Sequence, residues 1–551
     1  MISKVKPYFI PLIISVACYI YFFFPLLKSE NIIYSGGDSV RLHYASRLYL
    51  YDNLTNQQFP FWTERMFEGY PIFSDLERGY QNLPNVILVY LFGPFNSYKL
   101  LHFVLYLLGS LSLYLLLKTK LDKVIFFLPI NLLYFFSFMM LIHQQHFNII
   151  LTFYLLPLII YLTDLYCKRV NYKIPILLSF IYYFCITLGS LQSVLIVLAI
   201  QLIYFGLYSD LSTIKPFLIS FFVLTTLVSL PSIYTFYQIY INSQRAVVDI
   251  SGTGNFDMYL LIQTIYPFSY GIENFYIEQI DALYRKNEHS LYIGISIIFI
   301  SIYAFLATKL TKIKVLSILT ICFFLLSNFL LLPPFSLFRY WVRSEFAVSF
   351  LFCILIAEYY SSNSFILQSK KFLKVILILL LIAFIPIFLN KDILYIFKKA
   401  VLEDLSISII WAFLFVSTLI ILLTKFKYKE YLITFLIVFD ILFFTSKLDS
   451  NMITKVQEIK YEPILSSIPI YNNVESDDYS LLRNVVSTSG YSVLTPLVQE
   501  ETKKAELRSK LSFEKLLPLY LIFYFLYILA MYTFIKYNKH FYEYFKSGKR
   551  I

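Results

Sequence analysis

Residues 8–27, YFIPLIISVACYIYFFFPLL, contain no charged side chain and are long enough to cross a bilayer as one helix. The run follows Lys4 and Lys6, and no small-residue cleavage pattern comes after it, so we expect a retained first helix rather than a signal peptide. By the positive-inside rule, this helix begins in the cytoplasm.

Similar apolar stretches recur along the 551 residues, of which 59% are apolar or aromatic and only 15% charged. This composition excludes a disordered chain and an ordinary soluble enzyme. None of the five cysteines forms a C-x-x-C pair, so we expect no disulfide and no metal site from them. We predict an all-α polytopic membrane protein with about 14 transmembrane helices. Their expected positions are residues 8–27, 98–117, 124–142, 147–165, 174–190, 193–208, 216–234, 290–307, 315–332, 345–360, 374–390, 405–424, 430–446 and 516–535.

The formal charge of +12 is not spread evenly along the chain. With a cytoplasmic N-terminus, the short basic connections all fall on the cytoplasmic side, and most acidic residues fall outside. These connections include residues 118–123, 167–173, 308–314 and 425–429. The positive charge therefore orients the protein, with both termini in the cytoplasm, and we expect no nucleic-acid partner. The long segments expected outside are residues 28–97, 235–289 and 447–515.

The first outer segment, residues 28–97, carries several distinctive motifs: GGD at 36–38, FPFW at 59–62 and GYPIFSD at 69–75. After the first motif, apolar residues recur at helical spacing, which predicts a short amphipathic helix from Ser39 to Asn53 lying at the membrane interface. We expect Phe59, Phe61 and Trp62 to anchor the segment in that interface.

Asp38 has two roles that the sequence leaves open. Aspartate is favoured at a helix N-cap, where its charge meets the positive end of the helix dipole, so Asp38 is expected to cap the helix that follows it. A carboxylate held in one orientation at the outer boundary is also suited to act as a general base. The two roles are compatible.

The order and spacing of these motifs resemble those of the YfhO-like bacterial membrane proteins, a family assigned to the GT-C class of polyprenyl-phosphate-dependent glycosyltransferases. Further matching motifs follow in order: HFNII and PLII within 146–160, LGSLQ at 188–192, LPSIY and NSQR within 230–245, LYIG at 291–294 and FSLFRYWVR at 335–343. The resemblance implies a GT-C-like transmembrane domain over residues 1–446. It also implies a small outer segment at 447–515, reduced relative to the family, and a last helix with a basic tail at 516–551. Alternation over 479–493 predicts a short strand pair.

The resemblance implies an enzyme of the bacterial plasma membrane whose active site lies on the outer face. It would move a sugar from a polyprenyl-phosphate-linked donor to a hydroxyl of an envelope acceptor, teichoic acid or another cell-wall polymer, among membrane lipids. Asp38 matches the acid of the family's first loop and would be the general base. Asp75 would be a second acid that orients the acceptor or contacts a metal. We assign no cofactor and no metal ligands, and leave a divalent metal open.

The reaction also needs cations that stabilise the leaving phosphate. Arg339 and Arg343, four residues apart beside Pro333 and Pro334, are the expected phosphate ligands, and snorkelling to lipid headgroups is the alternative. Further substrate-binding candidates are Arg245, His146, Gln192 and Trp62.

Two other functions stay open, a transporter or flippase of lipid-linked saccharides and a non-catalytic membrane scaffold. A transporter predicts internal repeats and polar groups at the bilayer midplane, and we find no convincing repeat. Asp440 is the one acid deep within an expected span, which marks either a functional group or a packing contact with a neighbouring hydroxyl or tyrosine.

Overall fold

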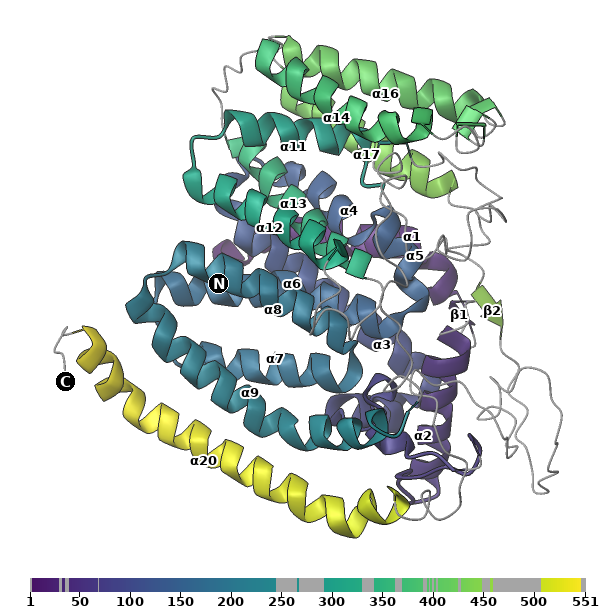
Figure 1. Cartoon of the computed structure of the whole chain (residues 1–551), viewed down its shortest axis with the longest axis vertical. Helices are drawn as coiled ribbons and strands as arrows, with labels where there is room; N and C mark the ends of the chain where they lie inside the picture. Colours follow the sequence, from purple (N-terminus) through teal and green to yellow (C-terminus); the bar gives the residue numbers. More distant parts are fainter. Residues whose placement is uncertain are drawn as a thin grey trace. The chain divides into compact units, whose positions relative to one another are not determined.

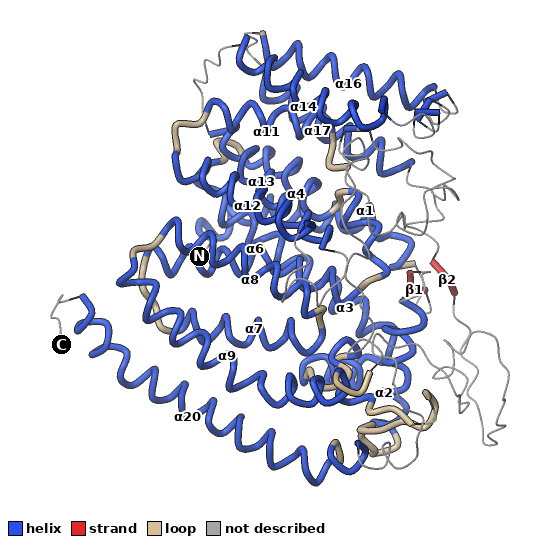
Figure 2. The backbone as a smooth tube through the Cα atoms, viewed as in Figure 1, coloured by secondary structure: helices blue, strands red, loops and turns tan. Residues whose placement is uncertain are grey.

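The structure is a computed structural model that describes part of the chain. The described residues are 2–28, 32–34, 39–67, 69–243, 265–266, 292–329, 341–361, 369–389, 394–395, 397–398, 401–402, 405–424, 428–447, 456–458 and 507–546. Helices predominate among them (Figure 2), and the strands in this part of the chain are β1 (Ile32–Tyr34) and β2 (Val456–Glu458).

Seven helices among the described residues are long and apolar enough to cross a membrane. They are Phe9–Leu27, Leu83–Lys120, Phe147–Lys168, Leu191–Tyr208, Leu211–Tyr240, Leu405–Leu423 and Leu507–Thr533. The chain is therefore a helical membrane protein, as its composition predicts. Helix also occurs within each of the other expected spans, in elements that are shorter or more charged.

The chain forms two compact units, each assembled from distant parts of the sequence. Unit 1 comprises Met1–Phe23, Leu107–Gln144 and Ile250–Lys455, and unit 2 comprises Phe24–Tyr106, Gln145–Asp249 and Val456–Ile551. The first outer segment and the last helix therefore belong to the same unit, although they lie near opposite ends of the sequence.

Unit 1 contains most of α1 (Ile2–Leu27) and a set of helices from the middle of the chain. These are α4 (Phe127–Phe135), α5 (Phe138–Ile142), α11 (Ile295–Ala307), α12 (Thr311–Phe329), α13 (Glu345–Ser361), α14 (Ser369–Leu389), α16 (Leu405–Leu423) and α17 (Lys429–Lys447) (Figure 1). Helix α13 packs against α11 and α12, and α16 packs against α11 and α17.

Three of the basic connections meet at one end of unit 1. Lys120 forms an ion pair with Glu358 at the end of α13, and the Thr308 hydroxyl donates to the same carboxylate. Lys123 donates to the Tyr431 hydroxyl at the start of α17. The connections thus share one end, as a common side of the membrane requires, and the side that this end faces stays a prediction.

Unit 2 contains the first outer segment and the helices beneath it. These are α2 (Ala45–Thr55), the first part of α3 (Leu83–Leu117), α6 (Phe147–Lys168), α7 (Lys173–Leu188), α8 (Leu191–Tyr208), α9 (Leu211–Tyr240) and α20 (Phe513–Lys546). Helix α9 packs between α7 and α20, and α6 packs against α7 and α8 (Figure 1).

Two expected spans differ from single straight helices. The stretch 124–142 is interrupted because Ser137 adopts an extended backbone, φ −63° and ψ 161°, between α4 and α5. Helix α3 begins before the expected residue 98 and is kinked at Gly93, whose φ is +73°, next to Pro94.

The predicted helix after the GGD motif exists, but it is not an amphipathic surface helix, because residues 42–50 are buried on all sides within unit 2. It begins as a turn of π-helix, η1 (Ser39–Tyr44), and continues as α2. Residues 42–50 are all buried, the polar ones included. A surface helix would leave its polar face in water, whereas here other parts of unit 2 provide that face with partners.

Candidate functional site

Helix α2 carries two adjacent buried polar residues, Ser46 and Arg47, which belong to different polar networks. The Ser46 network holds the rest of the first outer segment in place. The Arg47 network lies against α3 and α6. Both lie within unit 2, a few residues after the GGD motif.

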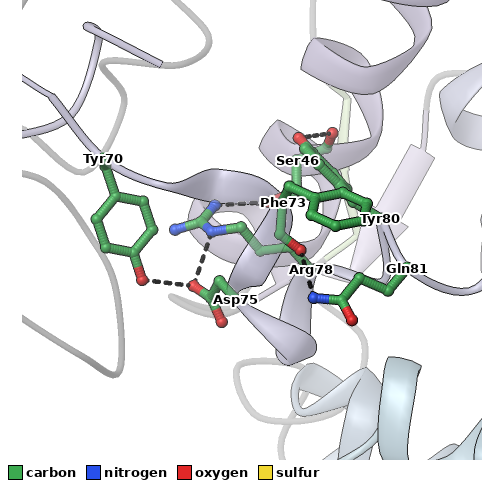
Figure 3. A network of polar contacts seen from close by, with 7 residues as sticks. All are labelled: Ser46, Tyr70, Phe73, Asp75, Arg78, Tyr80 and Gln81. Atoms are coloured by element: carbon green, nitrogen blue, oxygen red, sulfur yellow. Dashed lines mark hydrogen bonds and ion pairs between the residues drawn. The ribbon is translucent and has the colours of Figure 1, made fainter. Parts of the chain in front are cut away.

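The Ser46 network centres on an ion pair between Asp75 and Arg78 (Figure 3). Arg78 Nε donates to Asp75 Oδ2 at 3.0 Å, and the Tyr70 hydroxyl donates to the same oxygen at 3.0 Å. Arg78 also donates from its Nη1 to Ser46 Oγ at 2.6 Å, and the Tyr80 hydroxyl donates to the Ser46 carbonyl at 2.7 Å. The network therefore fastens α2 to the stretch 70–80.

Gln81 fastens the same stretch to the helices of unit 2. Its Nε2 donates to the Phe73 carbonyl at 2.9 Å (Figure 3) and to Thr235 Oγ1 in α9 at 3.0 Å. Its Oε1 accepts a hydrogen bond from the Tyr520 hydroxyl of α20 at 2.6 Å. Asn82 donates to Thr187 at the end of α7. These bonds connect residues 73–82 of the first outer segment to α7, α9 and α20 of unit 2.

Arg47 lies in a different environment, without an acidic partner among the described residues. Its side chain is 2% exposed, and its Nη1 donates to Ser97 Oγ of α3 at 3.2 Å. Its Nη2 has no hydrogen-bond partner in the described part of the chain. The guanidinium carbon lies 5.8 Å from the Tyr98 ring centroid and 5.1 Å from that of Phe147, within cation–π range.

Two histidines lie at the same aromatic cluster. The Phe147 ring stacks on Tyr98 at 4.1 Å, and the rings of His43 and His102 lie 5.8 and 6.3 Å from it. Both histidines are buried, at 4% and 1% exposure, and the Tyr154 hydroxyl lies 3.3 Å from His102 Nε2. Ser39, also buried, lies beside Tyr98. We call Ser39, His43, Arg47, Tyr98, His102 and Phe147 the Arg47 cage.

Burial changes the acid–base properties of this region. It lowers the pKa of Arg47 to about 10, because the charged form loses its hydration. The guanidinium is nevertheless protonated at neutral pH. Burial also raises the pKa of the Tyr80 phenol well above its usual value, although the nearby Arg78 opposes this shift.

A short sheet precedes the Arg47 cage. Strands β1 and β2 pair antiparallel, with Ile33 opposite Gln457, so the start of the first outer segment is hydrogen-bonded to the segment after α17. Both segments were predicted to lie outside the membrane, and the pairing requires that they lie on the same side.

The predicted site residues are distributed as follows. Asp38, Arg245 and Arg339 lie outside the described residues, as does the strand pair expected at 479–493. Arg343 is half-buried in unit 1, in the short 3-10 helix Trp341–Ser344. The remaining predicted site residues belong to unit 2, namely Trp62, Asp75, His146 and Gln192.

Those four residues occupy different places within unit 2. Asp75 is 1% exposed and bonded to Arg78, so its Oδ2 is engaged within the protein. His146 directly precedes Phe147 of the Arg47 cage, and Gln192 is buried in the first turn of α8. Trp62 is half-buried, and the Arg508 guanidinium lies 5.6 Å from its ring centroid.

Asp440 is a packing group that also caps a helix. Its Oδ1 accepts a hydrogen bond from the Tyr292 hydroxyl at 2.6 Å, and its Oδ2 accepts from the Ser296 backbone N–H at 2.9 Å, in the first turn of α11. Gly294 leaves room for the carboxylate, since a Cβ there would lie 3.3 Å from Oδ2. Of the two expectations for Asp440, contact with a neighbouring tyrosine is the one the structure supports, and the LYIG motif provides that tyrosine and glycine.

Sequence reasoning missed Arg47 and Glu345. Ser39, His43 and Arg47 are spaced by four residues, which places polar groups on one face of the expected helix and is the signal that was available. Glu345, the first residue of α13, is 2% exposed, and neither carboxylate oxygen has a hydrogen-bond partner among the described residues. No sequence pattern distinguished this carboxylate.

No group of three or more potential metal ligands occurs within the described ranges. Comparison of the chain with the models of known protein families, with curated proteins and with solved structures finds no match. The resemblance to YfhO-like proteins therefore stays an inference from the motifs and their order.

Proposed function

We propose that this protein is an extracytoplasmic glycosyltransferase of GT-C-like architecture with about 14 membrane spans. It would move a sugar from a polyprenyl-phosphate-linked donor to a hydroxyl of an envelope polymer on the outer face. Asp38 would take the proton of the attacking hydroxyl, since general-base catalysis needs a positioned carboxylate within reach of that hydroxyl.

The observation that carries this proposal is the burial of residues 42–50, shortly after Asp38, together with the hydrogen bonds that hold Ser46 and Arg47. A surface anchor would need only apolar contacts with lipid, but residues 42–50 are buried among polar as well as apolar side chains. Two buried arginines contribute to this packing, Arg47 within α2 and Arg78, which donates to Ser46 of α2. Catalytic groups need this kind of support, because a misplacement of about 1 Å can cost about a hundredfold in rate.

The decisive genetic experiment is deletion of the gene followed by glycan analysis of the envelope polymers. We expect loss of one side-chain sugar, restored by the wild-type gene and not by Asp38→Asn. Asparagine keeps the size and most of the capping ability of aspartate, so only the base is removed. The matched control is Asp122→Asn, the same change at an exposed aspartate in another connection.

Two outcomes would count against the proposal. Full restoration by Asp38→Asn would exclude Asp38 as the base. Accumulation of lipid-linked sugar in the cytoplasmic leaflet of the deletion strain would favour the alternative, a flippase of lipid-linked saccharides.

A further inference from the structure

Arg47 is a buried cation that has no acidic partner among the described residues, whereas Arg78 of the same unit has one. Arg47 and Arg78 are each 2% exposed, and both belong to unit 2. Arg78 donates to the Asp75 carboxylate at 3.0 Å, whereas no carboxylate of the described residues lies within ion-pair distance of Arg47. Burying an unpaired charge is costly, so an arginine in this position needs an anion from another source.

The contacts that Arg47 does make leave part of its hydrogen-bonding capacity unused. Nη1 donates to a neutral serine hydroxyl at 3.2 Å, and Nη2 donates to no described residue. Cation–π attraction to the rings of Tyr98 and Phe147 compensates for part of the hydration energy that the buried guanidinium loses. The ring faces accept no conventional hydrogen bond. The free edge of the guanidinium is therefore a donor pair for an acceptor that carries charge.

The rest of the Arg47 cage has the same electrostatic character. His43 and His102 carry ring N–H groups, Ser39 carries a hydroxyl, and the cage contains no carboxylate among the described residues. A phosphate monoester has a charge of about −1.5 to −2 at neutral pH and three acceptor oxygens, so it can both neutralise Arg47 and accept more than one hydrogen bond from its guanidinium. Arginine's planar fork suits such an anion.

We propose that the Arg47 cage is a phosphate-binding site of this protein, with Arg47 as its principal ligand and a phosphate ester as its occupant. Exposed apolar side chains on the first part of α3 belong to the same unit and suit contact with a lipid tail, which favours the headgroup of a lipid phosphate over a free phosphate. These side chains are Leu83, Ile87, Tyr90 and Leu91. Phosphate binding at this site does not depend on the proposed function. The identification of the bound lipid as the sugar donor or its lipid product rests on that function.

The test is a direct binding measurement on the purified full-length protein in detergent. The probe is a polyprenyl phosphate, with the polyprenol that lacks the phosphate and inorganic phosphate as comparison probes. We expect Arg47→Gln to weaken polyprenyl-phosphate binding about tenfold or more, because hydrogen bonds to charged groups are strong. Arg47→Lys keeps the charge without the fork and should weaken binding by a smaller factor.

The matched control is Arg169→Gln, which removes an exposed arginine from another connection and should bind as the wild type does. Competition by inorganic phosphate would mean that the phosphate alone is recognised, and binding that inorganic phosphate does not reduce would mean that the lipid tail contributes. Either outcome supports the site, provided that Arg47→Gln weakens the binding of polyprenyl phosphate. Equal binding of polyprenol and polyprenyl phosphate, or unchanged binding by folded Arg47→Gln, would overturn it.

A second measurement needs no variant and covers the case in which Arg47→Gln does not fold. Hydrogen exchange of the backbone at residues 39–55 of the wild-type protein should slow when polyprenyl phosphate is added and should not change with polyprenol. No difference between the two lipids at saturating concentration would contradict the proposal. Asp38→Asn should keep the binding, because Asp38 is not a ligand of the phosphate in this proposal. If the wild-type protein binds polyprenyl phosphate but transfers no sugar, the phosphate site is supported and only the proposed function fails.

Discussion

Asp75 and Arg78 form an ion pair at 3.0 Å in which the two side chains are 1% and 0% exposed. The pair joins two short 3-10 helices, Ile72–Ser74 and Leu76–Arg78, and through Arg78 it reaches Ser46 in α2. The attraction within such a buried pair adds little to the free energy of folding, because both charges lose their hydration. Loss of one partner, however, leaves the other charge buried and unpaired, which is strongly destabilising. Its main effect is therefore to fix one arrangement of the first outer segment.

The first prediction concerns the stability of this pair. Asp75→Asn or Arg78→Gln should each lower the free energy of unfolding by about 3–5 kcal/mol, because each leaves one buried charge unpaired. The double variant Asp75→Asn with Arg78→Gln should recover part of that loss. Thermal unfolding of the purified protein measures the effect, and additive losses in the double variant would contradict the pairing.

An exposed ion pair in the same unit is the control. Arg508 and Glu64 lie 2.9 Å apart with side chains 62% and 49% exposed, so Glu64→Gln should cost no more than about 1 kcal/mol. The double variant at residues 75 and 78 also tests the predicted role of Asp75 as a second acid. If it folds and transfers sugar normally, Asp75 does not act on the acceptor.

The second prediction compares two glycines with nearly equal backbone conformation. Gly79 has φ +72° and Gly93 has φ +73°. A Cβ at Gly79 would lie 2.3 Å from Leu188 Cδ1 and 2.9 Å from Asn85 Nδ2, whereas a Cβ at Gly93 would meet nothing within 4 Å. Gly93→Ala should cost about 1–2 kcal/mol from the left-handed conformation alone, and Gly79→Ala should cost clearly more. Equal losses in thermal unfolding would contradict the packing of α7 against the first outer segment.

The third prediction concerns Asp440. Asp440→Ala removes the acceptor of two hydrogen bonds and the cap of α11, so it should destabilise the protein by about 2–4 kcal/mol. Tyr292→Phe removes one of those bonds and should cost about 1–2 kcal/mol. Folded Tyr292→Phe protein should keep its full activity. A large loss of activity at unchanged stability would show that Asp440 has a functional role beyond packing.

The fourth prediction concerns the orientation in the membrane. Asn56 follows α2 and Thr119 lies in the basic connection 118–123, and both are exposed. In a variant without the five native cysteines, Asn56→Cys should react with a membrane-impermeant maleimide added to intact cells. Thr119→Cys should react only after the membrane is made permeable. The reverse pattern would place the first outer segment in the cytoplasm and exclude an outer active site.

The position of the helix after the GGD motif could be predicted from the sequence, but its burial could not. Its position was predicted at Ser39–Asn53 and is confirmed by η1 and α2, because helical spacing of apolar residues is a local signal. Its burial was not predicted, because the partners that bury it are distant. Arg78 lies 32 residues after Ser46, and Ser97 lies 50 residues after Arg47.

For Asp440, the sequence indicated two explanations but could not decide between them. The cost of a carboxylate within an apolar helix was evident from the sequence, and so were its two alternative explanations. The choice between them depended on Tyr292, which lies 148 residues earlier in the chain. The break near Ser137 escaped prediction for a related reason, since the apolar run continues across it.

The central claim, that Asp38 is the base of a sugar transfer from a lipid phosphate, is tested most directly with purified protein. The assay supplies a polyprenyl-phosphate-linked radioactive sugar and an envelope polymer with free hydroxyl groups, and it measures label in the polymer. The wild-type protein should transfer the sugar, and folded Asp38→Asn should be slower by about 100- to 10,000-fold, the usual contribution of a general base. Transfer by Asp38→Asn at the wild-type rate would contradict the account.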